Sequence, residues 1–124
     1  IKVYCPEIVD KKQRFLVDTG SAINLIQCDA LRSFMKVDLS TSMEIAGLTH
    51  DSVKTLGPCE FHLLGTAATF HIVDMELPVE GVGIIGHEFL KREQVDISYG
   101  SQNIVLAKAP TKPIYWYRDL SPGG

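Results

Sequence analysis

The sequence has few of the residues that build disulfide frameworks or metal centres. It contains three cysteines, Cys5, Cys28 and Cys59, with no C-x-x-C spacing. Its four histidines form neither an H-E-x-x-H motif nor any paired cluster. An odd cysteine count and scattered histidines argue against a disulfide scaffold and against a zinc site. The lack of a disulfide framework favours a reducing, intracellular setting.

Long apolar runs and a basic excess are missing as well. No apolar stretch approaches the roughly 20 residues that a membrane-spanning helix requires. The formal net charge is -3, and the 12 Lys and Arg residues are scattered along the chain. Proteins that bind nucleic-acid phosphates usually concentrate basic residues on one face. We therefore expect a soluble protein that binds neither a membrane nor nucleic acid directly.

What the sequence does contain is a series of short β-like runs. A chain of 124 residues with 45% hydrophobic residues has the size of one domain with a buried core. Several strands with short links predict an all-β barrel or sandwich-like fold. The runs that are rich in Val, Ile, Phe and Thr lie at 1–4, 13–17, 42–46, 52–56, 60–64, 68–73, 94–97 and 103–107.

Two stretches break this pattern and predict short helices. Residues 27–35 carry apolar side chains at helical spacing. Residues 87–92 follow Gly86 and end in two cationic side chains, which suit the negative end of a helix.

The C-terminal segment has a different composition. From Pro110 onward it combines prolines with the aromatic residues Tyr115, Trp116 and Tyr117. Such a tail is either a flexible extension or a strand that docks on a partner, and three large aromatics favour docking. We expect one domain over residues 1–108, followed by this extension over residues 109–124.

The candidate catalytic group is Asp18. It directly follows the apolar run Phe-Leu-Val and precedes Thr19, Gly20 and Ser21. An apolar strand delivers the carboxylate to the interior, where an ionised group needs partners. Gly20 lets the backbone turn sharply, and the hydroxyls of Thr19 and Ser21 can fix the carboxylate geometry. Asp and Gly are also favoured in ordinary turns, so the tripeptide alone is a weak signal.

A second motif, Ile-Ile-Gly at 84–86, opens the helix expected at 87–92. Together with Asp-Thr-Gly at 18–20, it resembles the paired signatures of retropepsin-like aspartic proteases. The chain is particularly similar to the proteases of gypsy-type long-terminal-repeat retrotransposons and of retroviruses. The resemblance covers residues 1–108. It implies an all-β fold, a small closed barrel with one or two short helices, that functions as a symmetric homodimer.

The resemblance also implies roles for the matching residues. Asp18 resembles the catalytic aspartate, and Thr19 resembles the threonine that bonds its counterpart across the dimer axis. Gly20 and Ser21 resemble the loop that orients the carboxylate. The motif at 84–86 resembles the signature that packs beneath this loop. The positions expected to contact substrate are Ser21, Ala22, Ala46, Gly47, Leu48, Ile84 and Ile85.

A hairpin is expected between the two motifs. Residues 43–56 form two arms of alternating apolar residues around the sequence Gly-Leu-Thr-His-Asp at 47–51. In order along the chain, it corresponds to the flap of the family, which closes over substrate. An ordinary surface hairpin is the alternative, and the flanking motifs favour the flap.

Two positions depart from the retroviral pattern. Retroviral members often carry an acidic residue two positions past the motif glycine and an arginine just after the second motif. This chain has Ala22 and His87 there. The corresponding ion pair is therefore absent, which puts contacts at the substrate ends and the tightness of the dimer in doubt.

The run Gly-Val-Gly-Ile-Ile-Gly at 81–86 also matches the G-x-G-x-x-G dinucleotide motif. That motif needs a long helix after it and an acidic residue about 20 residues further on. The helix expected at 87–92 is short, and no acid lies near residues 101–106. We therefore expect no nucleotide site.

The sequence as a whole predicts an aspartic endopeptidase that cleaves a polyprotein. One chain supplies one Asp18, whereas this chemistry uses two carboxylates, so a homodimer with its active site on the twofold axis is expected. No metal or organic cofactor is required. The resemblance suggests the cytoplasm or a virus-like particle as its location. The alternative is a catalytically silent or host-domesticated module of the same fold that dimerises or binds peptides.

Overall fold

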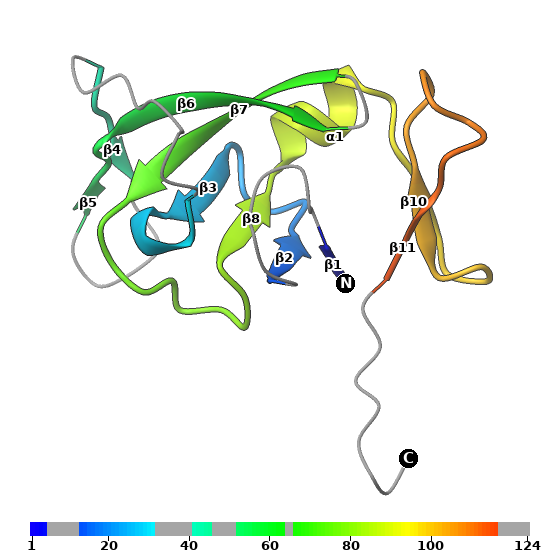
Figure 1. The fold of residues 1–124 in the computed structure, drawn as a ribbon, viewed down its shortest axis with the longest axis horizontal. Helices are drawn as coiled ribbons and strands as arrows, with labels where there is room; N and C mark the ends of the chain where they lie inside the picture. The colour runs from blue at the N-terminus through cyan, green and yellow to red at the C-terminus, as the bar shows by residue number, and fades with distance from the viewer. Residues whose placement is uncertain (5–12, 32–40, 46–51, 64–65, 117–124) are drawn as a thin grey trace, which may run out of the picture.

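The computed structural model describes residues 1–4, 13–31, 41–45, 52–63 and 66–116 (Figure 1). Across these residues the regular secondary structure is mostly β-strand, with one short α-helix. This confirms the expected β fold at that level. The closed barrel and the homodimer stay predictions.

Six strands form the main sheet, and their order positions the loop that carries Asp18. β8 pairs in parallel with β2 and antiparallel with β3. A strand from late in the chain thus lies between two strands that are consecutive in sequence, and it separates the two ends of the Asp18 loop. From one edge to the other the strands are β1 (Lys2–Tyr4), β2 (Arg14–Val17), β8 (Gly83–Ile85), β3 (Asn24–Gln27), β7 (Thr66–Val73) and β6 (Gly57–Leu63).

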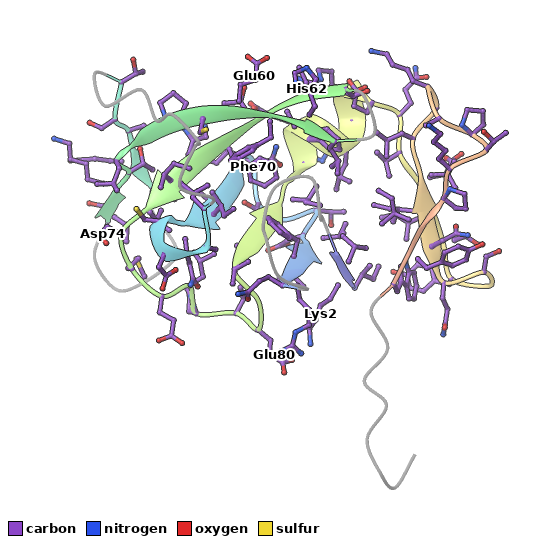
Figure 2. All side chains as sticks on the ribbon, in the orientation of Figure 1. Lys2, Glu60, His62, Phe70, Asp74 and Glu80 are labelled. Atoms are coloured by element: carbon purple, nitrogen blue, oxygen red, sulfur yellow. The ribbon has the colours of Figure 1, made fainter. Side chains whose placement is uncertain are left out.

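Alternating side chains of the long hairpin fill the core. β6 and β7 pair along their length, and buried residues recur at every second position over most of both strands. Figure 2 shows Phe70 of β7 pointing into the interior, whereas the exposed Glu60 and His62 of β6 point outward. The Phe70 ring meets those of Phe15 and Phe61 edge to face, with centroids 5.8 and 5.4 Å apart. These ring contacts fasten β2 and β6 to β7.

A small two-stranded sheet forms the base of the predicted flap. β4 (Glu44–Ile45) pairs antiparallel with β5 (Val53–Lys54). The side chain of Thr55 extends this connection, because its hydroxyl accepts a hydrogen bond of 3.0 Å from the Met43 N–H. The expected flap tip at 47–51 lies outside the described residues.

A three-stranded sheet is built from the last part of the chain. It consists of β9 (Asp96–Ser98), β10 (Asn103–Val105) and β11 (Ile114–Tyr115), with β10 in the middle. A bridge between Val3 and Trp116 joins it to the main sheet. Part of the expected C-terminal extension therefore pairs with its own chain. Docking of the extension on a partner stays a prediction.

The α-helix of the described residues, α1 (His87–Arg92), has the bounds that the sequence predicts. Gly86 precedes it, Phe89 and Leu90 are buried, and the last turn is cationic. The other expected helix, over 27–35, is wrong in its first part, because β3 continues through Gln27. A single 3₁₀ turn follows at Cys28–Ala30, and residues 32–35 lie outside the described part of the chain. No helix among the described residues has the length and apolar character to cross a membrane.

The search for alternating residues in the sequence did not predict β3 and β8, because both strands are buried on two faces. All four residues of β3 and all three of β8 are buried. A strand with no solvent-facing side has no polar residues at alternate positions, so a search for period two does not find it.

A buried carboxylate, that of Glu93, lies at the C-terminal end of α1. Glu93 follows the helix and is 4% exposed. Its Oε2 accepts a hydrogen bond of 2.8 Å from Arg92 Nε, and Lys108 Nζ lies 3.5 Å from its Oε1. Burial raises the pKa of Glu93, but the hydrogen bond from Arg92 and the charges of Lys108 and Arg92 outweigh burial and hold the pKa below its ordinary value.

We predict that Glu93→Gln lowers the free energy of unfolding by about 1–2 kcal/mol near pH 7 and by less near pH 3. The folded-state pKa is depressed, so the carboxylate's contribution is complete above the unfolded-state pKa. It is lost as the pH falls through the folded-state pKa. Urea unfolding at both pH values measures the difference, with Glu76→Gln on an exposed loop as control. An equal loss at both pH values would contradict this account.

Candidate active site

Asp18 lies at the point where β2 ends and the chain enters the Asp18 loop, residues 18–23. Its backbone N–H donates to the Ile85 carbonyl at 3.0 Å, which extends the pairing of β2 with β8 by one residue. The Gly20 N–H donates to Asp18 Oδ1 at 2.9 Å. The Ser21 N–H donates to the Asp18 carbonyl at 3.2 Å. The half-buried carboxylate is therefore held in one orientation by the turn that follows it.

Gly20 and Ser21 of the loop are small for different structural reasons. A Cβ added at Gly20 would lie 3.2 Å from Asp18 Oδ1, a tight contact at the atom that the Gly20 N–H approaches. The Ser21 hydroxyl donates to the Ile23 carbonyl at 2.9 Å, so it stabilises the loop backbone. Thr19 is exposed. Its predicted bond across a dimer axis stays a prediction.

The segment from Gly86 to Glu88, which we call the β8–α1 junction, packs beneath the loop. The His87 N–H donates to the Ser21 carbonyl at 2.6 Å, and the Glu88 N–H donates to the Ala22 carbonyl at 3.1 Å. A Cβ at Gly86 would lie 2.4 Å from the Ile23 carbonyl oxygen. Only a glycine allows the junction and the loop to approach this closely.

The two departures from the retroviral pattern, Ala22 and His87, both lie in this contact. Their side chains are exposed. The contact is made by the backbone, through the bonds from the His87 and Glu88 N–H groups. The loop is thus attached to the junction without the ion pair that retroviral members place there.

A cavity of about 480 Å³ opens in front of the Asp18 carboxylate. The loop contributes mainly polar and small residues to its wall, and the rest of the chain contributes mainly apolar ones. Such a lining suits an extended peptide whose side chains are largely apolar. The loop residues are Asp18, Gly20, Ser21, Ala22 and Ile23, and the residues from the rest of the chain are Leu25, Met43, Glu44, Ile45 and Ile84.

The cavity brings together most of the predicted site residues that the structure describes. Ser21, Ala22 and Ile84 line it together with Asp18 and Gly20. Ile85 does not, because it is fully buried in the core, where its carbonyl accepts the Asp18 N–H. The remaining predicted substrate contacts lie outside the described residues, at Ala46, Gly47 and Leu48.

Five residues of the cavity wall were not predicted as site residues. Met43, Glu44 and Ile45 belong to the first arm of the predicted flap, so the sequence pattern could have identified them. Leu25 carried no such signal, because β3 has no alternation. Ile23 lies in the loop before β3, outside any periodic run.

A larger cavity, of about 630 Å³, shares Ile23 with the first but does not contain Asp18. It lies between β7 and α1, where His71 and Glu88 line it. Burial lowers the pKa of His71, and the Glu88 carboxylate opposes this shift. We assign the candidate site to the smaller cavity because it contains the carboxylate that the loop orients.

Close packing also explains the glycines of the G-x-G-x-x-G match. A Cβ at Gly81 would lie 2.5 Å from the Arg14 carbonyl oxygen, and its φ is +134°. A Cβ at Gly83 would lie 2.5 Å from the Phe15 ring. These glycines let β8 and the residues before it approach β2. Among the described residues, no group of three or more His, Cys, Asp or Glu side chains could hold a metal ion.

Comparisons with known proteins bear on the fold. No protein-family model matches the chain. No curated protein matches it either. Among solved structures, the chain is similar to the crystal structure of the retroviral protease-like domain of Ddi1 from Leishmania major. The TM-score is 0.66 and the sequence identity 17%, over 97% of this chain and 95% of that chain. The chain therefore has the retropepsin-like fold.

Proposed function

We propose that this protein is an aspartic endopeptidase that acts as a symmetric homodimer of closed barrels, with one Asp18 from each subunit. The observation that carries this proposal is the Asp18 carboxylate itself. It is oriented by the Gly20 N–H at 2.9 Å and opens onto a cavity with apolar strand residues in its wall. A strand with alternating buried residues that ends in an oriented carboxylate at such a cavity suits acid–base chemistry on a bound peptide.

The need for two subunits follows from the chemistry. Two carboxylates that lie close together share one proton, because both cannot ionise at such a distance. The aspartic-protease pair is the well-known example of this behaviour. Within one subunit, the other acid in the described cavity wall is Glu44 of β4, and it lies in register with Lys54 of β5. The second carboxylate of the pair therefore comes from a second copy of Asp18.

The reaction uses the two carboxylates in different protonation states. The ionised Asp18 takes a proton from a water molecule, whose oxygen attacks the carbonyl carbon of the peptide bond. The protonated Asp18 of the other subunit donates to the carbonyl oxygen and polarises it. A proton then passes to the amide nitrogen as the carbon–nitrogen bond breaks. Only the singly protonated pair is active, so activity has a maximum on the acid side.

The substrate of this proposal is an extended polypeptide segment. Its backbone pairs with strand edges beside the cavity, and its side chains enter the space next to Leu25, Ile45 and Ile84. The resemblance to retrotransposon proteases suggests a polyprotein as the natural substrate, cleaved in the cytoplasm or within a virus-like particle.

Asp18→Asn tests the role of the carboxylate. We predict that it lowers the rate of peptide cleavage by at least about a hundredfold, because the pair loses its acid–base group, while the fold is kept. A fluorogenic peptide assay over the acid range measures the rate. Asp74→Asn is the matched control, since Asp74 is an exposed acid outside the cavity wall (Figure 2).

Retained cleavage by purified Asp18→Asn would refute the assignment. If the unaltered protein is folded and binds a statine-type inhibitor or a peptide but cleaves nothing, the non-catalytic binding module is the correct alternative.

Mixing subunits tests the shared site. When equal amounts of the unaltered chain and Asp18→Asn exchange subunits freely, about a quarter of the dimers contain two carboxylates. We predict that activity per unaltered chain falls to about half of its unmixed value, because half of the unaltered chains enter dimers with one carboxylate. In an equal mixture with Asp74→Asn every dimer keeps two Asp18 carboxylates, so the activity per chain that carries Asp18 should be unchanged. An unchanged activity in the first mixture, with exchange shown by mass-tagged chains, would mean that each subunit works alone.

A further inference from the structure

We propose that Asn24 is a positioning residue of this reaction, which holds the β8–α1 junction, and through it the Asp18 loop, in the catalytic geometry. The inference rests on the proposed function. Asn24 does not line the cavity that contains Asp18, so its role is indirect.

The Asn24 carboxamide bonds with two segments that are remote in sequence. Its Oδ1 accepts a hydrogen bond of 2.7 Å from the Gly86 N–H, and its Nδ2 donates one of 3.1 Å to the Thr69 carbonyl. The residue is 6% exposed. A carboxamide with both ends bonded has one favoured orientation, and here it also borders the larger cavity between β7 and α1.

The bond to Gly86 acts at the residue where the junction approaches the loop most closely. Gly86 fits against the Ile23 and Ser21 carbonyl oxygens, from which an added Cβ would lie only 2.4 and 2.8 Å away. The next two N–H groups of the junction, from His87 and Glu88, donate to loop carbonyls. A shift of Gly86 would therefore move the donors that hold the loop carrying Asp18.

Nearby in the same strand, Gln27 provides a matched comparison. It is also a buried carboxamide, 8% exposed, and its Oε1 accepts a hydrogen bond of 2.9 Å from the Leu77 N–H. Gln27 thus stabilises the loop before β8, not the junction after it. Loss of either carboxamide leaves one buried N–H without its partner, so the two losses should cost similar stability.

The experiment compares Asn24→Ala with Gln27→Ala in the full chain, at concentrations where both are dimers. We predict that kcat falls about tenfold or more for Asn24→Ala, with KM within about twofold, because the carboxylate is misplaced rather than the peptide pocket lost. For Gln27→Ala, kcat should stay within about twofold. Equal losses of kcat in the two variants would overturn the positioning role.

Asn24→Asp provides a second variant in case Asn24→Ala does not fold. When protonated, the new carboxyl group can accept from the Gly86 N–H and donate to the Thr69 carbonyl, as the carboxamide does. When ionised, it can only accept, and one oxygen faces the Thr69 carbonyl. We predict near-normal kcat at the acid end of the pH profile and an early loss as the pH rises. A pH profile with the same shape as that of the unaltered protein would overturn the proposal.

Amide hydrogen exchange separates this inference from the proposed function. In Asn24→Ala, the amides of Gly20 and His87 should exchange faster, whereas in Gln27→Ala they should be unchanged. If the unaltered protein cleaves no peptide, the proposed function fails and exchange alone decides whether Asn24 holds the loop. Unchanged protection of both amides in Asn24→Ala would refute it.

Discussion

The backbone pairing of β8 between β2 and β3 is the constraint on which the rest of the structure depends. β2 runs toward Asp18 and β3 runs away from the loop, and neither pairs with the other. Their shared neighbour comes from late in the chain and continues directly into α1. The end of β8 and the start of α1 therefore both anchor the Asp18 loop, the former through the Ile85 carbonyl and the latter through the His87 and Glu88 N–H groups.

This arrangement explains why the site combines a small loop with a rigid base. The base is buried, since β3 and β8 are covered on both faces. The loop presents its carboxylate to a cavity whose wall includes the base of the β4–β5 hairpin, through Met43, Glu44 and Ile45. Sites built on buried strands hold a reacting group more precisely than mobile loops do, which suits the proposed reaction, because that reaction depends on the spacing of two carboxylates.

The sequence predicted those parts of the molecule whose physical cause is local. The strand before Asp18 and the start of α1 after Gly86 were both predicted, because each depends on residues that are neighbours in the sequence. β3 was not predicted as a strand, because a strand buried on both faces has no alternation, and its last residue, Gln27, was placed in the expected helix. The wall residue Leu25 was missed for that reason. Asn24 could not have been found, because its two hydrogen-bond partners, Gly86 and Thr69, come close only in the folded sheet.

The retropepsin-like fold is shown by the similarity of nearly the whole chain to a solved retroviral protease-like domain. The chemistry is our proposal, based on the geometry of the candidate site. This chemistry requires that two Asp18 side chains meet at one water molecule. A crystal structure of the protein with a statine-type inhibitor tests it most directly. We expect a twofold dimer in which the inhibitor hydroxyl contacts both Asp18 carboxylates, which lie about 3 Å apart. Inhibitor bound within one subunit, with its Asp18 remote from any second copy, would refute the shared site.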